Sequence, residues 1–264
     1  MTDANVSYDV AESVATIRLA RPDAMNSLTR ATKDELKRAV LDAAGDDGVR
    51  CVVVTGSGRA FCVGQDLREH AEALQTKPLE EIWATVPDHY APIALGLATM
   101  PKPVIAALNG VAAGAGASIA FACDFRIGAE GAGFNTAFAA IGLSCDTGIS
   151  WTLPRLIGRA AAIDLLIRPR TVKAPEAAEL GLLTQVVAAE DLESATAEFA
   201  RQLASGPTQA YAAIKRSVNN AATHDLADAL DFEGEQMALT GGTQDHRDAV
   251  AAFVAKEQPI FHGR

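Results

Sequence analysis

Two segments of the chain share one pattern of hydrophobic and polar positions, a short apolar run followed by a glycine-rich turn. They are CVVVTGSGRAFCVGQDL at 51–67 and PVIAALNGVAAGAGASIAFACD at 103–124. Each pattern predicts a strand, a tight turn and the first turn of a helix. The N–H groups at the start of a helix have no partner inside the helix, and the helix dipole makes that end positive.

Two such turns can act on one ligand atom if the fold brings them together. Two N–H groups that donate to one oxygen form an oxyanion hole, which stabilises the negative charge of a reacting thioester or ester. The alternative is that these glycines only serve tight turns and close packing of helices on strands. The occurrence of the pattern in two segments favours the oxyanion hole.

The remaining pattern predicts strands first, then strands alternating with helices, and finally helices alone. It predicts strands at 6–10, 14–19 and 125–129, and a helix from Thr29 or Thr32 to about residue 44. Prolines interrupt 80–100, which predicts a broken helical region near a ligand entrance. We therefore expect an α/β core over residues 1–190 and an all-α C-terminal part over 191–264.

Composition narrows the possible partners. The chain has 264 residues, 49% of them hydrophobic, which is enough to bury a large core. A net charge of −10 argues against nucleic acid or an anionic membrane surface as the main partner. A small anionic ligand remains compatible with this charge, because a local cluster of basic residues can hold it. We expect a small-molecule substrate.

Cysteine usage and the uncharged segments indicate the compartment. The four cysteines form no CxxC pair and no zinc-type spacing with histidine, so we expect no metal site and a reduced, cytoplasmic chain. The first ten residues lack the features of a signal peptide. The uncharged stretch 103–123 is long enough to span a bilayer, but its proline, its Asn109-Gly110 pair and its many small residues favour a buried strand and helix.

Several motifs, in their order along the chain, resemble the enoyl-CoA hydratase/isomerase, or crotonase, superfamily. They are RPDAMNSL (21–28), GRAFCVGQDL (58–67), NGVAAGAGASIAFACDFRIGAE (109–130), GLSCDTGISWTLPRLIGRA (142–160), APEAAELGL (174–182) and TQDHRDAVAAFVAKEQPIFHGR (243–264). The resemblance implies a spiral of ββα units with a C-terminal helical trimerisation region. It also implies an acyl-CoA substrate, no cofactor beyond the coenzyme A of that substrate, and a homotrimer or dimer of trimers.

The resemblance also assigns the site, residue by residue. It implies that the backbone N–H groups of Gln65 and Ala115 form the oxyanion hole and that Asp146 is catalytic. The substrate-binding positions that it implies are Asp23, Ala24, Met25, Gly64, Asp66, Leu67, Arg68, Gly114, Ser118, Phe138, Phe253 and Lys256. Phe253 and Lys256 match residues that reach the coenzyme A of a neighbouring subunit.

Departures from the family pattern indicate the reaction. Hydratases of this family use two glutamates, and Ser118 and Phe138 occupy those positions here. Neither side chain can serve as an acid or base for adding water near neutral pH, so we expect no enoyl-CoA hydration. Phe138, the Asp146 loop and TQDH make the chain most similar to the 1,2-epoxyphenylacetyl-CoA isomerase branch, which acts in phenylacetate breakdown. That branch commonly has a proline before the aspartate, where this chain has Cys145.

Three functions remain open. The first is an acyl-CoA isomerase in which Asp146 moves a proton. The second is a dehalogenase or thioesterase in which Asp146 attacks the substrate or activates water, and the third is a catalytically silent acyl-CoA binder. Asp146 could also be a helix cap only, because Asp-Thr-Gly precedes an apolar run. We further expect Asp66 to support the oxyanion loop, and His89 to fill the surface or the core.

Overall fold

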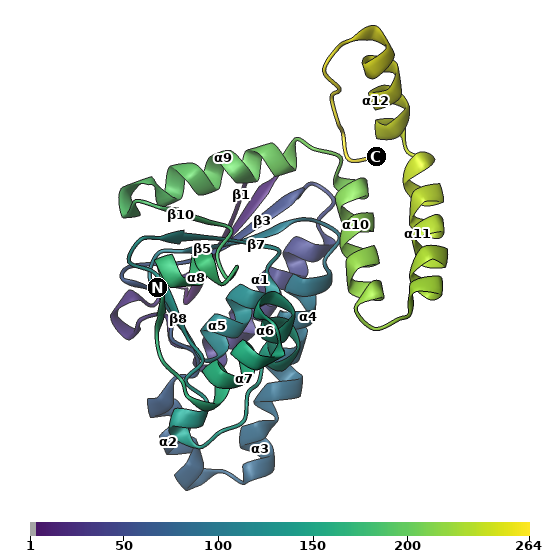
Figure 1. Cartoon of the computed structure of the whole chain (residues 1–264). Helices are drawn as coiled ribbons and strands as arrows, with labels where there is room; N and C mark the ends of the chain where they lie inside the picture. Colours follow the sequence, from purple (N-terminus) through teal and green to yellow (C-terminus); the bar gives the residue numbers. More distant parts are fainter. Residues whose placement is uncertain (1–3) are drawn as a thin grey trace.

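Two sheets organise the computed structural model, which describes residues 4–264 (Figure 1). The larger sheet has the strand order β1-β2-β3-β5-β7-β10. Its strands are β1 (Val6–Ala11), β2 (Val14–Leu19), β3 (Cys51–Gly56), β5 (Val104–Leu108), β7 (Phe125–Ala129) and β10 (Gln185–Val187). β1 and β2 pair antiparallel, and the remaining neighbours pair parallel. The strands predicted at 6–10, 14–19 and 125–129 are confirmed, and so is the strand predicted at the start of the segment 51–67.

Short strands after the turns form the smaller sheet, in the order β4-β6-β8-β9. They are β4 (Ala60–Cys62), β6 (Val111–Ala113), β8 (Gly133–Asn135) and β9 (Val172–Lys173). Each of β3, β5 and β7 is therefore followed by one strand of the second sheet, which gives the repeating units of the expected spiral. The sequence pattern predicted turns here rather than strands, because three residues are too few to show an alternation.

Helices cover both sheets and form the C-terminal region. Their bounds are α1 (Arg30–Gly45), α2 (Leu67–Thr76), α3 (Leu79–Trp83), α4 (Ala91–Thr99), α5 (Ala115–Ala122), α6 (Ile149–Ile157), α7 (Arg159–Ile167), α8 (Ala174–Glu179), α9 (Leu192–Ala204), α10 (Thr208–Ala221), α11 (Leu226–Gly241) and α12 (Gln244–Ala255). Thr29 caps α1 by accepting from Thr32 N–H, as predicted. The predicted broken region contains α3, a π-helical turn at Val86–Tyr90, and α4.

The larger sheet has an apolar core on each face. Most buried side chains lie between the sheet and the helices that include α1, α4 and α5. On the opposite face α9 lies across the sheet, and its Leu192, Ala200 and Ala204 pack against Val53 and Ile105 (Figure 1). The sheet core therefore extends to Ala204, one helix beyond the boundary predicted at residue 190.

In the C-terminal region α10 packs beside α4, and α11 and α12 extend away from the two sheets (Figure 1). No residue of α11 is buried, and the carboxylate of Asp245 in α12 accepts from the N–H groups of His262 and Gly263. Arg50 and Lys215 connect this region to the core, because Arg50 donates to Thr208 and Lys215 pairs with Asp124. Polar contacts therefore hold much of the junction.

The uncharged stretch 103–123 folds as β5, β6 and α5, in agreement with the predicted strand and helix. Within residues 4–264, no helix is both long and apolar enough to cross a bilayer. All four cysteines carry free thiols.

Candidate active site

The backbone N–H groups of Gln65 and Ala115 lack an acceptor among residues 4–264, whereas the N–H groups of the adjacent Asp66 and Gly114 are bonded. Asp66 N–H donates to Leu28 O at 3.1 Å, and Gly114 N–H donates to Asn135 O at 2.9 Å. Unpaired N–H groups inside a protein are costly, so their occurrence on two adjoining turns indicates a ligand oxygen as the intended partner.

Glycines bring these two turns together. A Cβ on Gly64, which has a φ of +81°, would lie 3.1 Å from Ala115 N and 2.8 Å from Ala113 O. A Cβ on Gly116 would lie 2.1 Å from Cys62 O, so no larger residue fits there. The repeated glycine pattern therefore places the Gln65 turn directly against the start of α5.

Asp66 organises the first turn. Its carboxylate caps α2 by accepting from Arg68 N–H and Glu69 N–H, and it accepts from Ser27 Oγ at 2.8 Å and Arg21 at 3.1 Å. These bonds hold the pKa of Asp66 below its ordinary value despite the opposing effect of burial. Gln65 therefore lies before the helix cap, and the helix itself begins at Leu67.

The side chain of Gln65 is also fixed. Its Oε1 accepts from Lys33 Nζ at 3.0 Å and from Tyr90 Oη at 2.6 Å. Lys33 donates to Thr85 Oγ1 at 2.6 Å as well. Lys33 and Tyr90 are buried although both carry polar groups, and neither was among the predicted site residues. A signal for Lys33 existed, since a lysine at 33 lies on the same helical face as Leu36 and Val40.

A cavity of about 840 Å³ opens beside both turns and brings most of the predicted site residues together. Its predicted lining residues are Asp23, Ala24, Met25, Gln65, Asp66, Leu67, Arg68, Gly114, Ala115, Phe138 and Asp146. A smaller cavity of about 170 Å³ shares Gln65, Leu143 and Asp146 with it, and continues to Lys33 and Trp83. The two cavities together can hold a long ligand with its reacting atoms near Gln65.

Asp146 faces both cavities, and its side chain does not cap a helix. Gly148 is the N-cap of α6, and no side chain bonds to the start of that helix. The carboxylate accepts from Thr147 Oγ1 at 2.8 Å, and burial raises its pKa above the ordinary value of 3.8. The cap-only interpretation therefore does not hold for this geometry. A carboxyl with a raised pKa in a cavity is suited to proton transfer.

Left-handed backbone concentrates in the loops around the large cavity. Met25, Asn26, Ala137 and Thr147 all have φ between 50° and 57°, although none of them is glycine. Such conformations cost free energy and persist at sites where the geometry has a role. The buried Asn26 stabilises its loop, because its Nδ2 donates to Ser57 O and Ala60 O.

Some predicted residues lie outside these cavities. Ser118 is fully buried in α5, and its hydroxyl donates to Gly114 O, so it does not reach the cavity. Gly64 contributes the close approach described above rather than a lining surface. Phe253 and Lys256 lie at the end of α12, at the opposite end of the molecule from α2 and α3 (Figure 1). Within one chain they cannot contact the cavity.

His89 is buried, and both of its ring nitrogens have polar partners. Nε2 lies 3.2 Å from Asp34 Oδ1, and Nδ1 lies 3.2 Å from Thr85 Oγ1. Burial lowers the pKa of this imidazole, an effect that neighbouring lysines reinforce. His89 therefore acts as a structural residue between α1 and the turn before α4.

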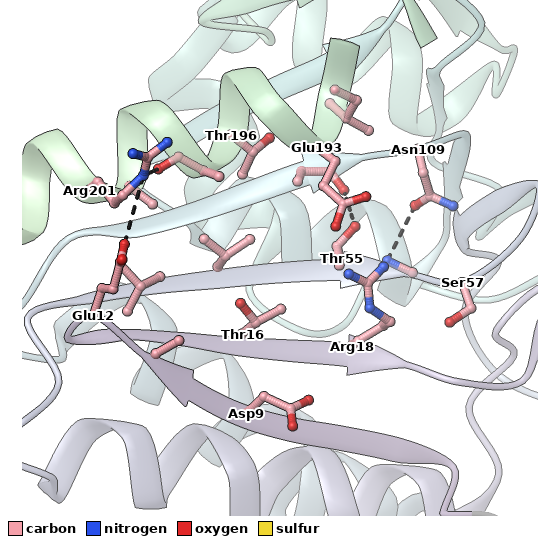
Figure 2. A pocket seen from close by; sticks show the side chains of 18 of the residues that line it. Asp9, Glu12, Thr16, Arg18, Thr55, Ser57, Asn109, Glu193, Thr196 and Arg201 are labelled. Atoms are coloured by element: carbon pink, nitrogen blue, oxygen red, sulfur yellow. Dashed lines mark hydrogen bonds and ion pairs between the residues drawn. The ribbon is translucent and has the colours of Figure 1, made fainter. Parts of the chain in front are cut away.

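A further cavity, of about 570 Å³, lies on the other face of the larger sheet, beneath α9 (Figure 2). Figure 2 shows that residues of both charges line it, and Arg201 there approaches Glu12 at 4.0 Å. Thr55 Oγ1 donates to Ala107 O, and Gly56 N–H donates to Asn109 Oδ1. None of the predicted site residues lines this cavity, so it is a weaker candidate.

Comparisons with known proteins give the family. A family model described as Enoyl-CoA hydratase/isomerase matches residues 9–264. The chain is 40% identical to 1,2-epoxyphenylacetyl-CoA isomerase of Escherichia coli (strain K12), over 97% of each chain. It is also 40% identical to a protein of Rhodobacter capsulatus named "Probable enoyl-CoA hydratase", over 98% of each chain.

Solved structures agree with these relatives. A crystal structure of an enoyl-CoA hydratase/isomerase family protein from Mycobacterium abscessus matches with a TM-score of 0.94 and 41% identity, covering 98% of this chain and 100% of that one. The α/β crotonase fold expected from the resemblance is thus confirmed. One relative is named an isomerase and the other a hydratase, and both are 40% identical to this chain. Sequence identity alone therefore does not decide the reaction. The chain belongs to the enoyl-CoA hydratase/isomerase family.

Proposed function

We propose that the protein is an acyl-CoA isomerase in which Asp146 carries the proton. The observation that supports this most directly is that Asp146 faces the same cavity as the two unpartnered N–H groups of Gln65 and Ala115. A base and an oxyanion hole on one cavity are the two elements that enolate chemistry needs.

In the proposed reaction the thioester oxygen accepts from both N–H groups. Asp146 removes a proton from the acyl carbon beside the thioester, and the electron pair moves onto the thioester oxygen as an enolate. Return of that proton to another acyl carbon completes a double-bond shift, with no net gain or loss of atoms. For an aryl epoxide, the same two elements would support ring opening. The raised pKa of Asp146 makes its carboxylate a stronger base near neutral pH.

The two glutamate positions support isomerisation rather than hydration. Phe138 lines the cavity with an apolar ring, and the Ser118 hydroxyl donates to Gly114 O. Neither can activate a water molecule. The name of the Escherichia coli relative, 1,2-epoxyphenylacetyl-CoA isomerase, points in the same direction.

The two cavities suggest how the substrate lies. We assign coenzyme A to the larger cavity, along Asp23–Met25 and Arg68, and the acyl group to the smaller one. Trp83 and Tyr90 line the acyl cavity and offer aromatic surfaces to an aryl ring. We further propose that no cofactor takes part beyond the coenzyme A of the substrate.

We also propose that the C-terminal helices bind a second copy of the chain, as a trimer or dimer of trimers. Large apolar side chains on α10–α12 and in the segment after α12 are exposed, which is unusual for a surface that faces water only. These include Ile214, Val218, Leu226, Leu230, Met237, Leu239, Val250, Phe253, Val254 and Ile260. Phe253 and Lys256 would then reach the coenzyme A of a neighbour. Light scattering of wild type and Phe253→Asp tests this, and a monomeric wild type would contradict it.

The test of the reaction is Asp146→Asn, with Asp191→Asn on the far face of the sheet as the control. If Asp146 moves the proton, turnover of a 3-enoyl-CoA or an aryl-epoxide acyl-CoA falls by about 10²–10⁴ while acyl-CoA affinity changes little. Full activity of Asp146→Asn would exclude this role. Release of halide from a halogenated aryl acyl-CoA would favour a dehalogenase, and binding without turnover of any of these compounds would favour a silent binder.

A further inference from the structure

Lys33 places a positive charge in the wall of the acyl cavity. It lies in the first turns of α1, and only 3% of its surface is exposed. Burying an ammonium group is costly unless hydrogen bonds compensate. Burial lowers the pKa of Lys33, while Glu69 and Asp146 oppose that effect. A lysine on an otherwise apolar helical face, in a binding cavity, calls for a functional explanation.

The Nζ atom of Lys33 has one N–H donor more than it has hydrogen-bond acceptors. An ammonium group has three N–H donors, and within residues 4–264 Nζ donates to two acceptors, Gln65 Oε1 and Thr85 Oγ1. Nζ also lies 5.1 Å from the centre of the Tyr90 ring. The third N–H therefore has no hydrogen-bond acceptor in the described part of the chain.

Asp146 lines the same cavity but does not accept a hydrogen bond from Lys33 Nζ. The two residues line one cavity, yet no ion pair within 4.0 Å joins them in the described structure. Their charges still act on each other, because Lys33 lowers the pKa of Asp146. A ligand atom between them would meet a base on one side and a donor on the other.

We propose that Lys33 donates a hydrogen bond to an oxygen atom on the acyl group, so that the site selects acyl-CoA substrates oxygenated close to the thioester. The position of this oxygen relative to the thioester follows from Gln65. The Gln65 side chain accepts a hydrogen bond from Lys33, and its backbone N–H is assigned to the thioester oxygen. An oxygen within a few atoms of the thioester carbonyl can reach Nζ. This inference rests on the proposed acyl-CoA site and specifies the chemistry of its substrate.

A pair of ligands of the same shape tests the proposal by binding alone. 2-Methoxyphenylacetyl-CoA carries an ether oxygen where 2-ethylphenylacetyl-CoA carries a methylene group, and neither needs to react. Calorimetry of the full-length protein should show about tenfold to a hundredfold tighter binding of the methoxy compound, the usual effect of a hydrogen bond to a charged group. Equal affinities in wild type would overturn the proposal.

Variants then assign the preference to Lys33. Lys33→Met keeps a long side chain without donors and should abolish the preference for the oxygen. Lys37→Met, one turn along α1, is the control, because Lys37 is more exposed and donates to Asp88 O; it should retain the preference. A preference that survives in Lys33→Met, or equal weakening of both ligands, would show that Lys33 only supports Gln65.

Ligand binding and turnover together distinguish a failure of the Lys33 proposal from a failure of the proposed reaction. If Asp146→Asn loses no activity while the oxygen preference depends on Lys33, the isomerase mechanism fails and the specificity stands. If isomerisation of a 3-enoyl-CoA depends on Asp146 while both ligands bind alike, the mechanism stands and the specificity fails. If Lys33→Met does not fold, Lys33→Gln, which retains N–H donors, takes its place as the variant. The comparison of the two ligands in wild type still decides the proposal.

Discussion

The carboxylate of Asp146 accepts a 2.8 Å hydrogen bond from the hydroxyl of its neighbour Thr147, which itself has a φ of 52°. This local bond orients the carboxylate, and burial raises its pKa. The hydrogen bond and the charge of Lys33 act in the opposite direction and favour the ionised form. The Asp146 carboxylate is thus held by a loop with left-handed backbone rather than by a helix cap.

The pH dependence of turnover should follow Asp146. The base must be ionised, so kcat/KM should fall as pH decreases through the pKa of Asp146, at a pH above the ordinary carboxyl value of 3.8. Thr147→Val removes the hydrogen bond that lowers this pKa, and should therefore move the fall in kcat/KM to higher pH. A pH–rate profile of both proteins checks this, and identical profiles would contradict it.

Stability should respond to Asp146 in the direction opposite to activity. A carboxyl whose pKa is raised in the folded state lowers stability as pH increases from its unfolded value through its folded value. Asp146→Asn removes that effect, so at pH 7 its free energy of unfolding should equal or exceed that of wild type. Urea denaturation at pH 7 measures this, and a clearly less stable variant would indicate a structural role.

Ala115→Pro should remove one oxyanion donor and leave the fold in place. Proline is well tolerated at the first position of a helix, and Ala115 begins α5. Loss of a single oxyanion-hole donor reduces turnover by about 10²–10³. Steady-state kinetics together with circular dichroism check this. Unchanged turnover in a folded variant would mean that Ala115 N–H does not bind the thioester oxygen.

Crotonyl-CoA hydration should remain close to the uncatalysed rate. Phe138 faces the large cavity, and the Ser118 hydroxyl is fully buried, so this pair cannot deliver water. The loss of crotonyl-CoA absorbance over time is a direct assay. Rapid hydration would reveal an acid–base pair elsewhere in the cavity.

Lys215→Met should destabilise the junction between α10 and the core. Lys215 Nζ lies 2.8 Å from Asp124 Oδ2, and burial already raises the pKa of Asp124. The pair is only partly buried, so removing one partner should cost about 1–2 kcal/mol, less than for a fully buried pair. The loss should grow as pH rises, since Asp124 then ionises without a partner. Urea denaturation at pH 5 and pH 8 tests this, with the exposed Lys173→Met as a control.

The sequence was sufficient for the features that arise from local spacing. Alternation and β-branched runs predicted β1, β2 and β3, and Thr29 predicted the start of α1, because strand and helix patterns depend on neighbouring residues only. The two glycine-rich turns were visible in the sequence, and glycine permits their close approach at Gly64 and Gly116. The order of motifs identified the family.

Contacts between distant segments were decided by the tertiary structure. The packing of α9 on the sheet moved the core boundary past residue 190, because an amphipathic helix does not reveal which apolar surface it covers. The bonds that Gln65 accepts from Lys33 and Tyr90 join residues up to 32 positions apart, and sequence spacing does not encode them. Whether Asp146 caps a helix or faces a cavity depended on two backbone angles, those of Thr147 and Gly148, which only the folded loop determines.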